Sequence, residues 1–201
     1  ADWLENYAVP KGLHPAVTAF IRTRPDLLET TEQALERGHM IACTPRSWER
    51  VAQVMEHVGD RRLRRIMVAG IVGEAVAAEF AIVADDIAAT VQVAEMLEAS
   101  QRERRAMYPS TMHGLTALIH GLVGALDADN AGDVIEILAG IRTLAETRPE
   151  PAFKRMPLGE LTTYGFEALI RKGLDLGLAD AFLASPAFKA YSEEREAAGL
   201  A

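Results

Sequence analysis

The sequence predicts an all-α fold built from two helical parts. Apolar residues recur at intervals of three and four along most of the chain, which is the period of an amphipathic helix. Prolines and glycines cluster at the ends of these periodic segments, and no run of alternating β-branched residues indicates a strand. We expect residues 1–88 to form one helical domain and residues 89–201 to form a C-terminal helical extension.

Three segments make up the first forty residues. Residues 2–9 predict a short helix, and residues 14–24 predict a second one. Pro15 suits the first turn of that second helix, while Pro25 directly follows its end. Residues 29–44 are polar and mixed, so we expect a loop there, with at most a turn of helix.

A stronger helix start follows in the sequence "CTPRSWERV". Thr44 is a good N-cap and Pro45 is suited to the first helical position. The apolar residues then recur at helical spacing: Trp48, Val51, Ala52 and Met55.

Residues 61–87 read as one long apolar helix. Within it, residues 66–84 are apolar enough to require a membrane check, but they contain Glu74 and Glu79. A carboxylate in mid-bilayer costs on the order of 2.5–3.5 kcal/mol, and the surrounding alanines would not offset two of them. We therefore expect a buried helix rather than a membrane span. The core of the first domain should bury its Phe80 and Ile71 together with Trp48. A stripe of small residues predicts the close approach of another helix: Gly73, Ala77 and Ala81.

The second half of the chain continues in helical style. Residues 90–105 predict one helix, and apolar stripes over 115–126 and 134–144 predict two more. The polar turn "DADN" joins these two, so they should form an antiparallel hairpin. Further helices are expected over 161–174 and 178–183, and "SPAF" should open a last short helix.

Composition excludes several classes of protein. The net charge of −8 disfavours a general nucleic-acid binder or a membrane-surface binder, because both need a basic footprint. The single cysteine, Cys43, excludes an internal disulfide and fits a reducing, cytoplasmic compartment.

The chemical motifs of self-contained enzymes are absent. The chain has no G-x-x-x-x-G-K-S/T phosphate loop, no G-x-G-x-x-G, no G-x-S-x-G and no H-E-x-x-H. His39 and Cys43 are two potential ligands and do not make a zinc site, so no metal is expected. His113 and His120 are better explained as satisfied, partly buried histidines than as a catalytic pair, and His14 as a cap or a solvent contact. We expect no catalytic residue in this chain alone.

Arg46 is the one residue that local physics does not explain. It lies in the first turn of a helix, where the dipole is positive and several backbone N–H groups lack partners, so a cation there is unfavourable. Two interpretations stay open. In the first, Arg46 is a surface residue that folds away from the N–H groups or pairs with a carboxylate such as Glu49. In the second, it contributes a guanidinium fork to an anion site. The basic runs "RRLRR" (61–65) and "QRERR" (101–105) are expected to be solvated faces or linkers.

Three blocks carry a resemblance to a known family. "HPAVTAFIRTRPDLL", "TPRSWERVAQVM" and "VAGIVGEAVAAEF" occur in this order, and together they resemble the C-terminal part of MoxR-type AAA+ ATPases. The match covers residues 1 to about 88. In that family this region is the small helical lid that follows the nucleotide-binding α/β core. Residues 89–201 resemble the helical tail of these relatives only diffusely, and no site is transferred to them.

The resemblance implies a role for Arg46 as the sensor-2 residue, which reaches the terminal phosphates of the nucleotide. It also implies a parent protein that uses ATP and Mg and forms a homo-oligomer. In that parent, the lid would contact the nucleotide-binding core of the same protein, and the assembly would work with von Willebrand A-type partner proteins. The chain departs from the family because the Walker A, Walker B and sensor-1 elements are missing, so it should bind no cofactor tightly and hydrolyse no ATP alone. Two alternatives remain: a stand-alone helical adaptor for a partner protein, and an unrecognised helical enzyme or ligand carrier.

Overall fold

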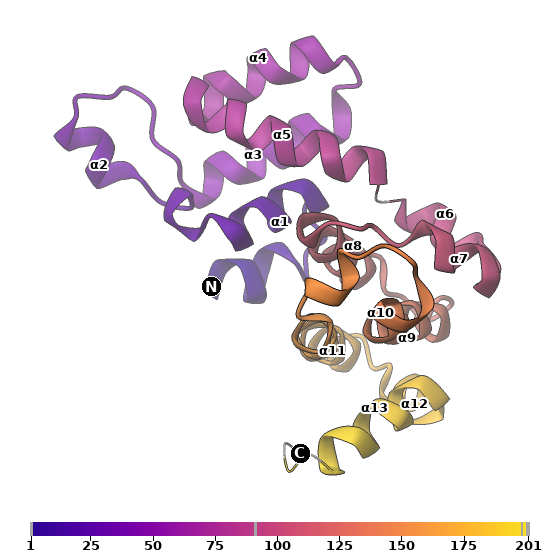
Figure 1. The fold of residues 1–201 in the computed structure, drawn as a ribbon. Helices are drawn as coiled ribbons and strands as arrows, with labels where there is room; N and C mark the ends of the chain where they lie inside the picture. Colours follow the sequence, from indigo (N-terminus) through magenta and orange to yellow (C-terminus); the bar gives the residue numbers. More distant parts are fainter. Residues whose placement is uncertain (1, 91, 198, 200–201) are drawn as a thin grey trace. The chain divides into compact units, whose positions relative to one another are not determined.

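The computed structural model describes residues 2–90, 92–197 and 199, and the regular secondary structure in them is helical, without a strand (Figure 1). The predicted all-α fold is therefore confirmed. The chain divides into two compact units, Ala1–Thr90 and Val91–Ala201, and each is described by itself below. Within the described ranges, no helix combines the length and the apolar character that crossing a bilayer would require.

The first unit contains four longer helices and several short helical segments. Its longer helices lie one after another along the chain: α1 (Pro15–Thr23), α3 (Pro45–His57), α4 (Arg61–Val72) and α5 (Glu74–Thr90). The short ones are a π-helical turn, a 3-10 turn and one short α-helix: Leu4–Ala8, Pro25–Leu27 and α2 (Thr31–Glu36). Helix α2 and the loop after it stand apart from the packed helices of this unit, as Figure 1 shows.

The prediction of a single long helix over residues 61–87 is wrong, because the helix is interrupted at Gly73. Gly73 has φ +88° and ψ 153°, a conformation that is essentially restricted to glycine. Its N–H donates to the carbonyl of Ala69 and its carbonyl accepts from the N–H of Ala77, so one residue ends α4 and begins α5. The two helices fold back on each other as a hairpin (Figure 1). The small-residue stripe thus starts at this corner, and its alanines, Ala77 and Ala81, line a hollow together with side chains of α4.

Three aromatic rings form the core of the first unit. Phe20 from α1, Trp48 from α3 and Phe80 from α5 lie with their ring centroids 5.4–5.8 Å apart, and each ring is buried. The burial expected for Trp48 and Phe80 is confirmed. That of Ile71 is wrong: its side chain is only half-buried, because it lies at the edge of the buried stripe of α4, which is formed by Val68 and Val72.

The second unit is made of short helices together with two long ones, α8 (Met112–Ala125) and α11 (Leu158–Asp175). They follow each other as α6 (Val93–Glu98), α7 (Gln101–Met107), α8, α9 (Ala131–Gly140), α10 (Leu144–Thr147), α11, α12 (Ala179–Ala184) and α13 (Pro186–Ala197). Two 3-10 turns, Ile141–Thr143 and Phe153–Arg155, join some of them.

The predicted hairpin is present as α8 and α9. Its turn is built by Asp127, whose carboxylate accepts from the N–H groups of Asp129 and Asn130, both at 2.9 Å. The second helix is shorter than expected, since α9 ends at Gly140 and a 3-10 turn leads into α10. The single helix expected over 90–105 is also wrong: Ser100 and Glu103 form a capping box that begins the separate helix α7.

Helix α11 lies unusually close to the α8–α9 hairpin. A side chain at Gly165 would place its first carbon 2.5 Å from Leu138 and 3.2 Å from Ile119. A larger residue would force these side chains to move, so the packing of α11 depends on that position.

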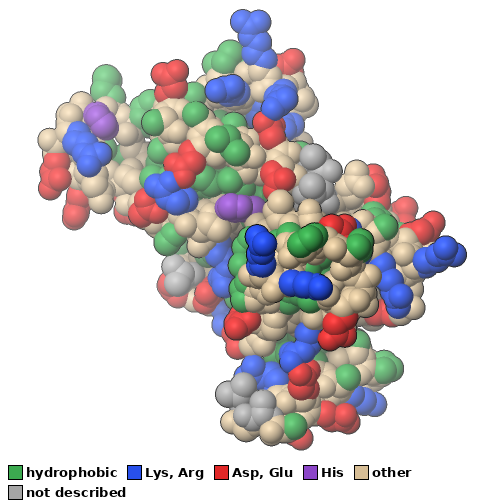
Figure 2. Space-filling view, in the orientation of Figure 1, with side chains coloured by type: hydrophobic (Ala, Val, Ile, Leu, Met, Phe, Trp, Pro, Cys, Tyr) green, Lys and Arg blue, Asp and Glu red, His purple; other side chains and the backbone are tan. Residues whose placement is uncertain are grey.

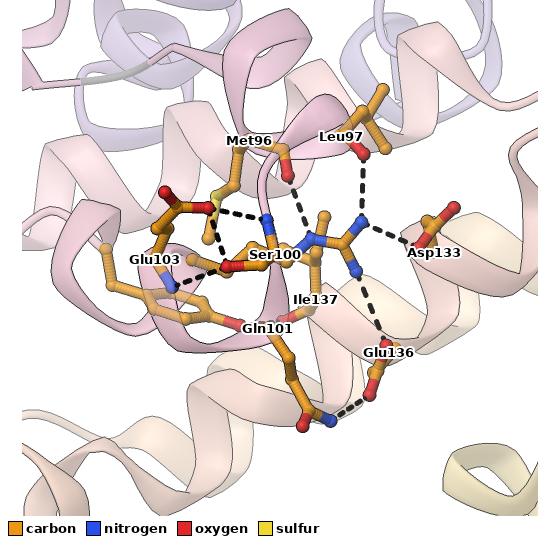
Figure 3. Close-up of polar contacts among 10 residues, drawn as sticks. Met96, Leu97, Ser100, Gln101, Glu103, Asp133, Glu136 and Ile137 are labelled. Atoms are coloured by element: carbon orange, nitrogen blue, oxygen red, sulfur yellow. Dashed lines mark hydrogen bonds and ion pairs between the residues drawn. The ribbon is translucent and has the colours of Figure 1, made fainter.

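Arg104 ties α6, α7 and α9 together (Figure 3). Its guanidinium donates to the backbone carbonyls of Met96 and Leu97, both at 2.9 Å, and pairs with Asp133 at 2.6 Å and with Glu136 at 3.3 Å. The side chain is only 9% exposed. The solvated face expected for residues 101–105 is thus wrong for this arginine, because its fork satisfies two helix-end carbonyls that would otherwise lack donors.

Candidate functional site

The start of α3 is rigidly defined, which fixes the position of Arg46. The Thr44 hydroxyl accepts from the Ser47 N–H at 3.1 Å, and the Thr44 carbonyl accepts from the Trp48 N–H at 3.1 Å. The two hydroxyls of Thr44 and Ser47 also bond each other at 3.0 Å. Thr44 is therefore the N-cap that the sequence predicted.

Trp48 anchors the same turn from the other side. Its ring is fully buried, and its indole N–H donates to the carbonyl of Leu27 at 2.8 Å. Arg46 precedes Trp48 by two residues, or about 200° around a helix, so the two side chains leave α3 on opposite sides. The core-facing tryptophan thus directs Arg46 outward, and the arginine is exposed.

Arg46 has no carboxylate within ion-pair distance among the described residues. The pairing with Glu49 that the sequence left open is therefore not formed. The backbone offers fewer free N–H groups to an anion at this helix end than the sequence suggested. Pro45 has no N–H, and the N–H groups of Ser47 and Trp48 are taken by Thr44, which leaves that of Arg46 in this turn. An anion at this end would be held chiefly by the guanidinium.

The segment that leads into α3 is also held in place. The Cys43 N–H donates to the Thr30 hydroxyl at 2.8 Å, and the Thr30 N–H donates to the Cys43 carbonyl at 3.0 Å. The thiol of Cys43 is buried beside the Val72 carbonyl, and this burial raises its pKa. A deprotonated, metal-binding or nucleophilic thiol is disfavoured there.

The other titratable candidates act within the fold. His14 caps α1, since its Nδ1 accepts from the Ala16 N–H at 3.2 Å. His120 is buried, and its Nε2 lies 2.8 Å from the Tyr164 hydroxyl. Glu79 pairs with Arg24. Across the residues that the structure describes, no three histidine, cysteine, aspartate or glutamate side chains gather as a metal site.

A groove between α4 and α5 was not anticipated from the sequence. It has a volume of about 340 Å³ and is lined by arginines from the start of α4 and by alanines of α5. A second hollow of about 820 Å³ lies between α2 and the α4–α5 corner and is lined by Cys43, Val72 and Gly73. Both depend on the distance between helices, for which the sequence carries no local signal.

Comparison with known proteins gave no match to a family model, to a curated protein or to a solved structure.

Proposed function

We propose that this chain is the nucleotide-sensing lid and helical extension of a MoxR-type AAA+ ATPase, with Arg46 contacting the terminal phosphates of ATP. The observation that carries the proposal is an exposed guanidinium, unpaired among the described residues, on a helix start that is fixed by the Thr44 cap and by Trp48. A cation at the positive end of α3 is unfavourable by itself, and a phosphate beside it would relieve that cost. The nucleotide and its Mg would be held mainly by an α/β core of the same protein.

The surface of the segment that precedes α3 supports contact with a further domain. Met40 is fully exposed, and Ile41 and Leu35 are 41% and 75% exposed. Apolar side chains grouped on one loop and its adjoining helix are typical of a surface that another domain covers. As in the family it resembles, the complete ATPase would be a homo-oligomer that acts with a von Willebrand A-type partner protein.

A second function, a helical adaptor without a motor, is favoured by one observation on α4. Leu63, Ile66 and Met67 are 48%, 61% and 40% exposed and lie on one helical face, outside the core of the first unit. Such a face fits a partner-binding helix. The reading frame upstream of residue 1 separates the two functions: a phosphate loop encoded there supports the lid, and its absence supports the adaptor.

Substitution of Arg46 tests the lid directly. In the complete ATPase, Arg46→Ala should lower turnover by about 10³-fold, as loss of a charged donor at a phosphoryl centre does. In the 201-residue chain, the same change should alter the free energy of unfolding by no more than about 0.5 kcal/mol, because the side chain is exposed. Arg46→Lys should recover only part of the activity, since lysine keeps the charge and loses the fork.

Arg50→Ala is the matched control, because Arg50 is exposed one turn further along α3. It should leave turnover unchanged. A large loss of stability in Arg46→Ala with normal turnover would make Arg46 a structural residue. Calorimetry adds a second check: the chain alone should bind ATP with a dissociation constant of roughly millimolar or weaker, since one arginine supplies only a few kcal/mol. Micromolar binding would contradict the lid.

A further inference from the structure

The start of α4 concentrates positive charge in an acidic protein. Four of its first five residues are arginines, Arg61, Arg62, Arg64 and Arg65, while the chain carries a net charge of −8. Arginines in the first turns of a helix oppose the helix dipole, so their placement is not explained by the stability of α4. Figure 2 shows basic side chains gathered over α4, at the top of the view.

Two of these arginines are used within the fold, and two are not. Arg61 pairs with Asp85 of α5. Arg64 donates from Nε and Nη2 to the carbonyl of Val58, at 3.0 and 2.8 Å. It thereby provides hydrogen-bond donors for the carbonyl that directly follows α3. Arg62 and Arg65 are exposed, and neither has a hydrogen bond or an ion pair to any residue in the described part of the chain. Both line the groove between α4 and α5.

The floor of that groove is apolar. It is formed by small side chains of α5 with larger ones beside them: Ala77, Ala81, Ala84, Phe80, Val68 and Met55. The alanines recur at helical spacing along α5, and their lack of bulk leaves the space open. At about 340 Å³ the groove lies at the lower end of the roughly 300–1,000 Å³ typical of ligand sites. It can therefore accept a few apolar side chains rather than a whole helix.

We propose that this groove binds an acidic, amphipathic segment of a partner protein, with its apolar side chains on the alanine floor and its carboxylates on Arg62 and Arg65. Charge complementarity selects this occupant, because four arginines and one carboxylate, Asp85, line the groove. Guanidinium forks bind carboxylates bidentately, and anchors on one face of a short helix are a common mode of peptide recognition. The proposal does not depend on Arg46, which lies in the first turn of α3, whereas the groove meets α3 at Met55 near its other end.

Fluorescence anisotropy of the whole chain tests this site with a labelled helical peptide. The probe carries leucine at every third or fourth position with glutamate beside it, and its control twin carries lysine in place of glutamate. The chain should bind the acidic probe with a micromolar to submillimolar dissociation constant, should bind the basic twin at least about tenfold more weakly, and should lose affinity as salt is added.

Two variants and one control locate the binding. Arg62→Gln with Arg65→Gln removes the free charges, and Ala81→Leu fills the floor; each should weaken binding about tenfold. Arg102→Gln with Arg155→Gln removes two exposed arginines of the second unit and should leave binding unchanged. Circular dichroism checks that each variant is folded, and the arginine pair, being exposed, keeps the test valid if Ala81→Leu does not fold.

Three results would overturn the proposal: no saturable binding of the acidic probe, equal binding by the arginine-pair variant, or tighter binding of dodecanoate than of the peptide. The last would assign the groove to a small amphiphilic carboxylate instead.

Discussion

His14 is a partly buried titratable group whose protonation state matters for the first unit. Burial, with the nearby charge of Arg64, lowers its pKa to about 4, against an ordinary value of 6.5. Its Nδ1 also accepts the Ala16 N–H, which an imidazolium cannot do, because both of its ring nitrogens are donors. The fold therefore requires the neutral ring.

A stability–pH profile should reveal this requirement. Because the folded pKa is lower than the unfolded one, the contribution of His14 is complete above pH 6.5 and is lost as the pH falls towards 4. The loss is at most about 3 kcal/mol. His14→Asn keeps a good N-cap without a titrating group, so its free energy of unfolding should fall less steeply over this range. His39→Asn, at an exposed position, is the control. Parallel profiles for His14→Asn and the unsubstituted chain would contradict the prediction.

Arg104 should be the residue with the largest stability effect among the arginines of α7. Removing it leaves the carbonyls of Met96 and Leu97 without donors and leaves Asp133 and Glu136 without their partner (Figure 3). Because both carboxylates are nearly half exposed, the expected cost of Arg104→Ala is roughly 2–4 kcal/mol rather than that of a fully buried pair. Chemical denaturation measures it, and the exposed Arg102→Ala should cost little. Equal midpoints for the two variants would show that the network is not stabilising.

At the scale of helices, two glycines three residues apart should respond in opposite directions to the same change. Gly73→Ala forces a side chain into a backbone region that is essentially restricted to glycine and should cost about 1–3 kcal/mol, although no atom lies within 4 Å of the new carbon. Gly70 lies inside α4, is exposed and also has no atom within 4 Å, so Gly70→Ala should stabilise by about 0.5–1 kcal/mol. Thermal unfolding measures both. Similar shifts would mean that the corner at Gly73 is not a fixed feature of the fold.

The helices that sequence periodicity predicted are largely those observed, but their boundaries show what periodicity misses. Gly73 lies between apolar segments that match one helix in register, although glycine followed by Glu74 is a recognisable end-and-start signal. Ser100 and Glu103 carried a similar signal, the spacing of a capping box. The partners of Arg104 carried none, because Asp133 and Glu136 are about thirty residues away on another helix. For the candidate site, the cap and the outward position of Arg46 follow from local sequence. The lack of a carboxylate partner for Arg46, and the α4–α5 groove, follow only from tertiary packing.

At the scale of the whole molecule, each unit has an aromatic cluster of its own. The first has Phe20, Trp48 and Phe80, and in the second Phe166 stacks on Tyr191 with ring centroids 4.1 Å apart. The chain has two tryptophans, Trp3 and Trp48, and both belong to the first unit. Tryptophan fluorescence therefore reports on one unit, whereas far-UV circular dichroism reports on the helices of both.

Two core substitutions should then separate the unfolding of the units. Phe80→Ala and Phe166→Ala each remove a buried ring and should each cost about 3–5 kcal/mol within their own unit. If the units unfold independently, Phe80→Ala should move the fluorescence transition to lower denaturant and leave a later dichroism transition in place. Phe166→Ala should leave the fluorescence midpoint unchanged and create an early loss of dichroism. Coincident transitions that shift together in both variants would show instead that the two units unfold as one cooperative body, since a single equilibrium must respond equally to damage in either core.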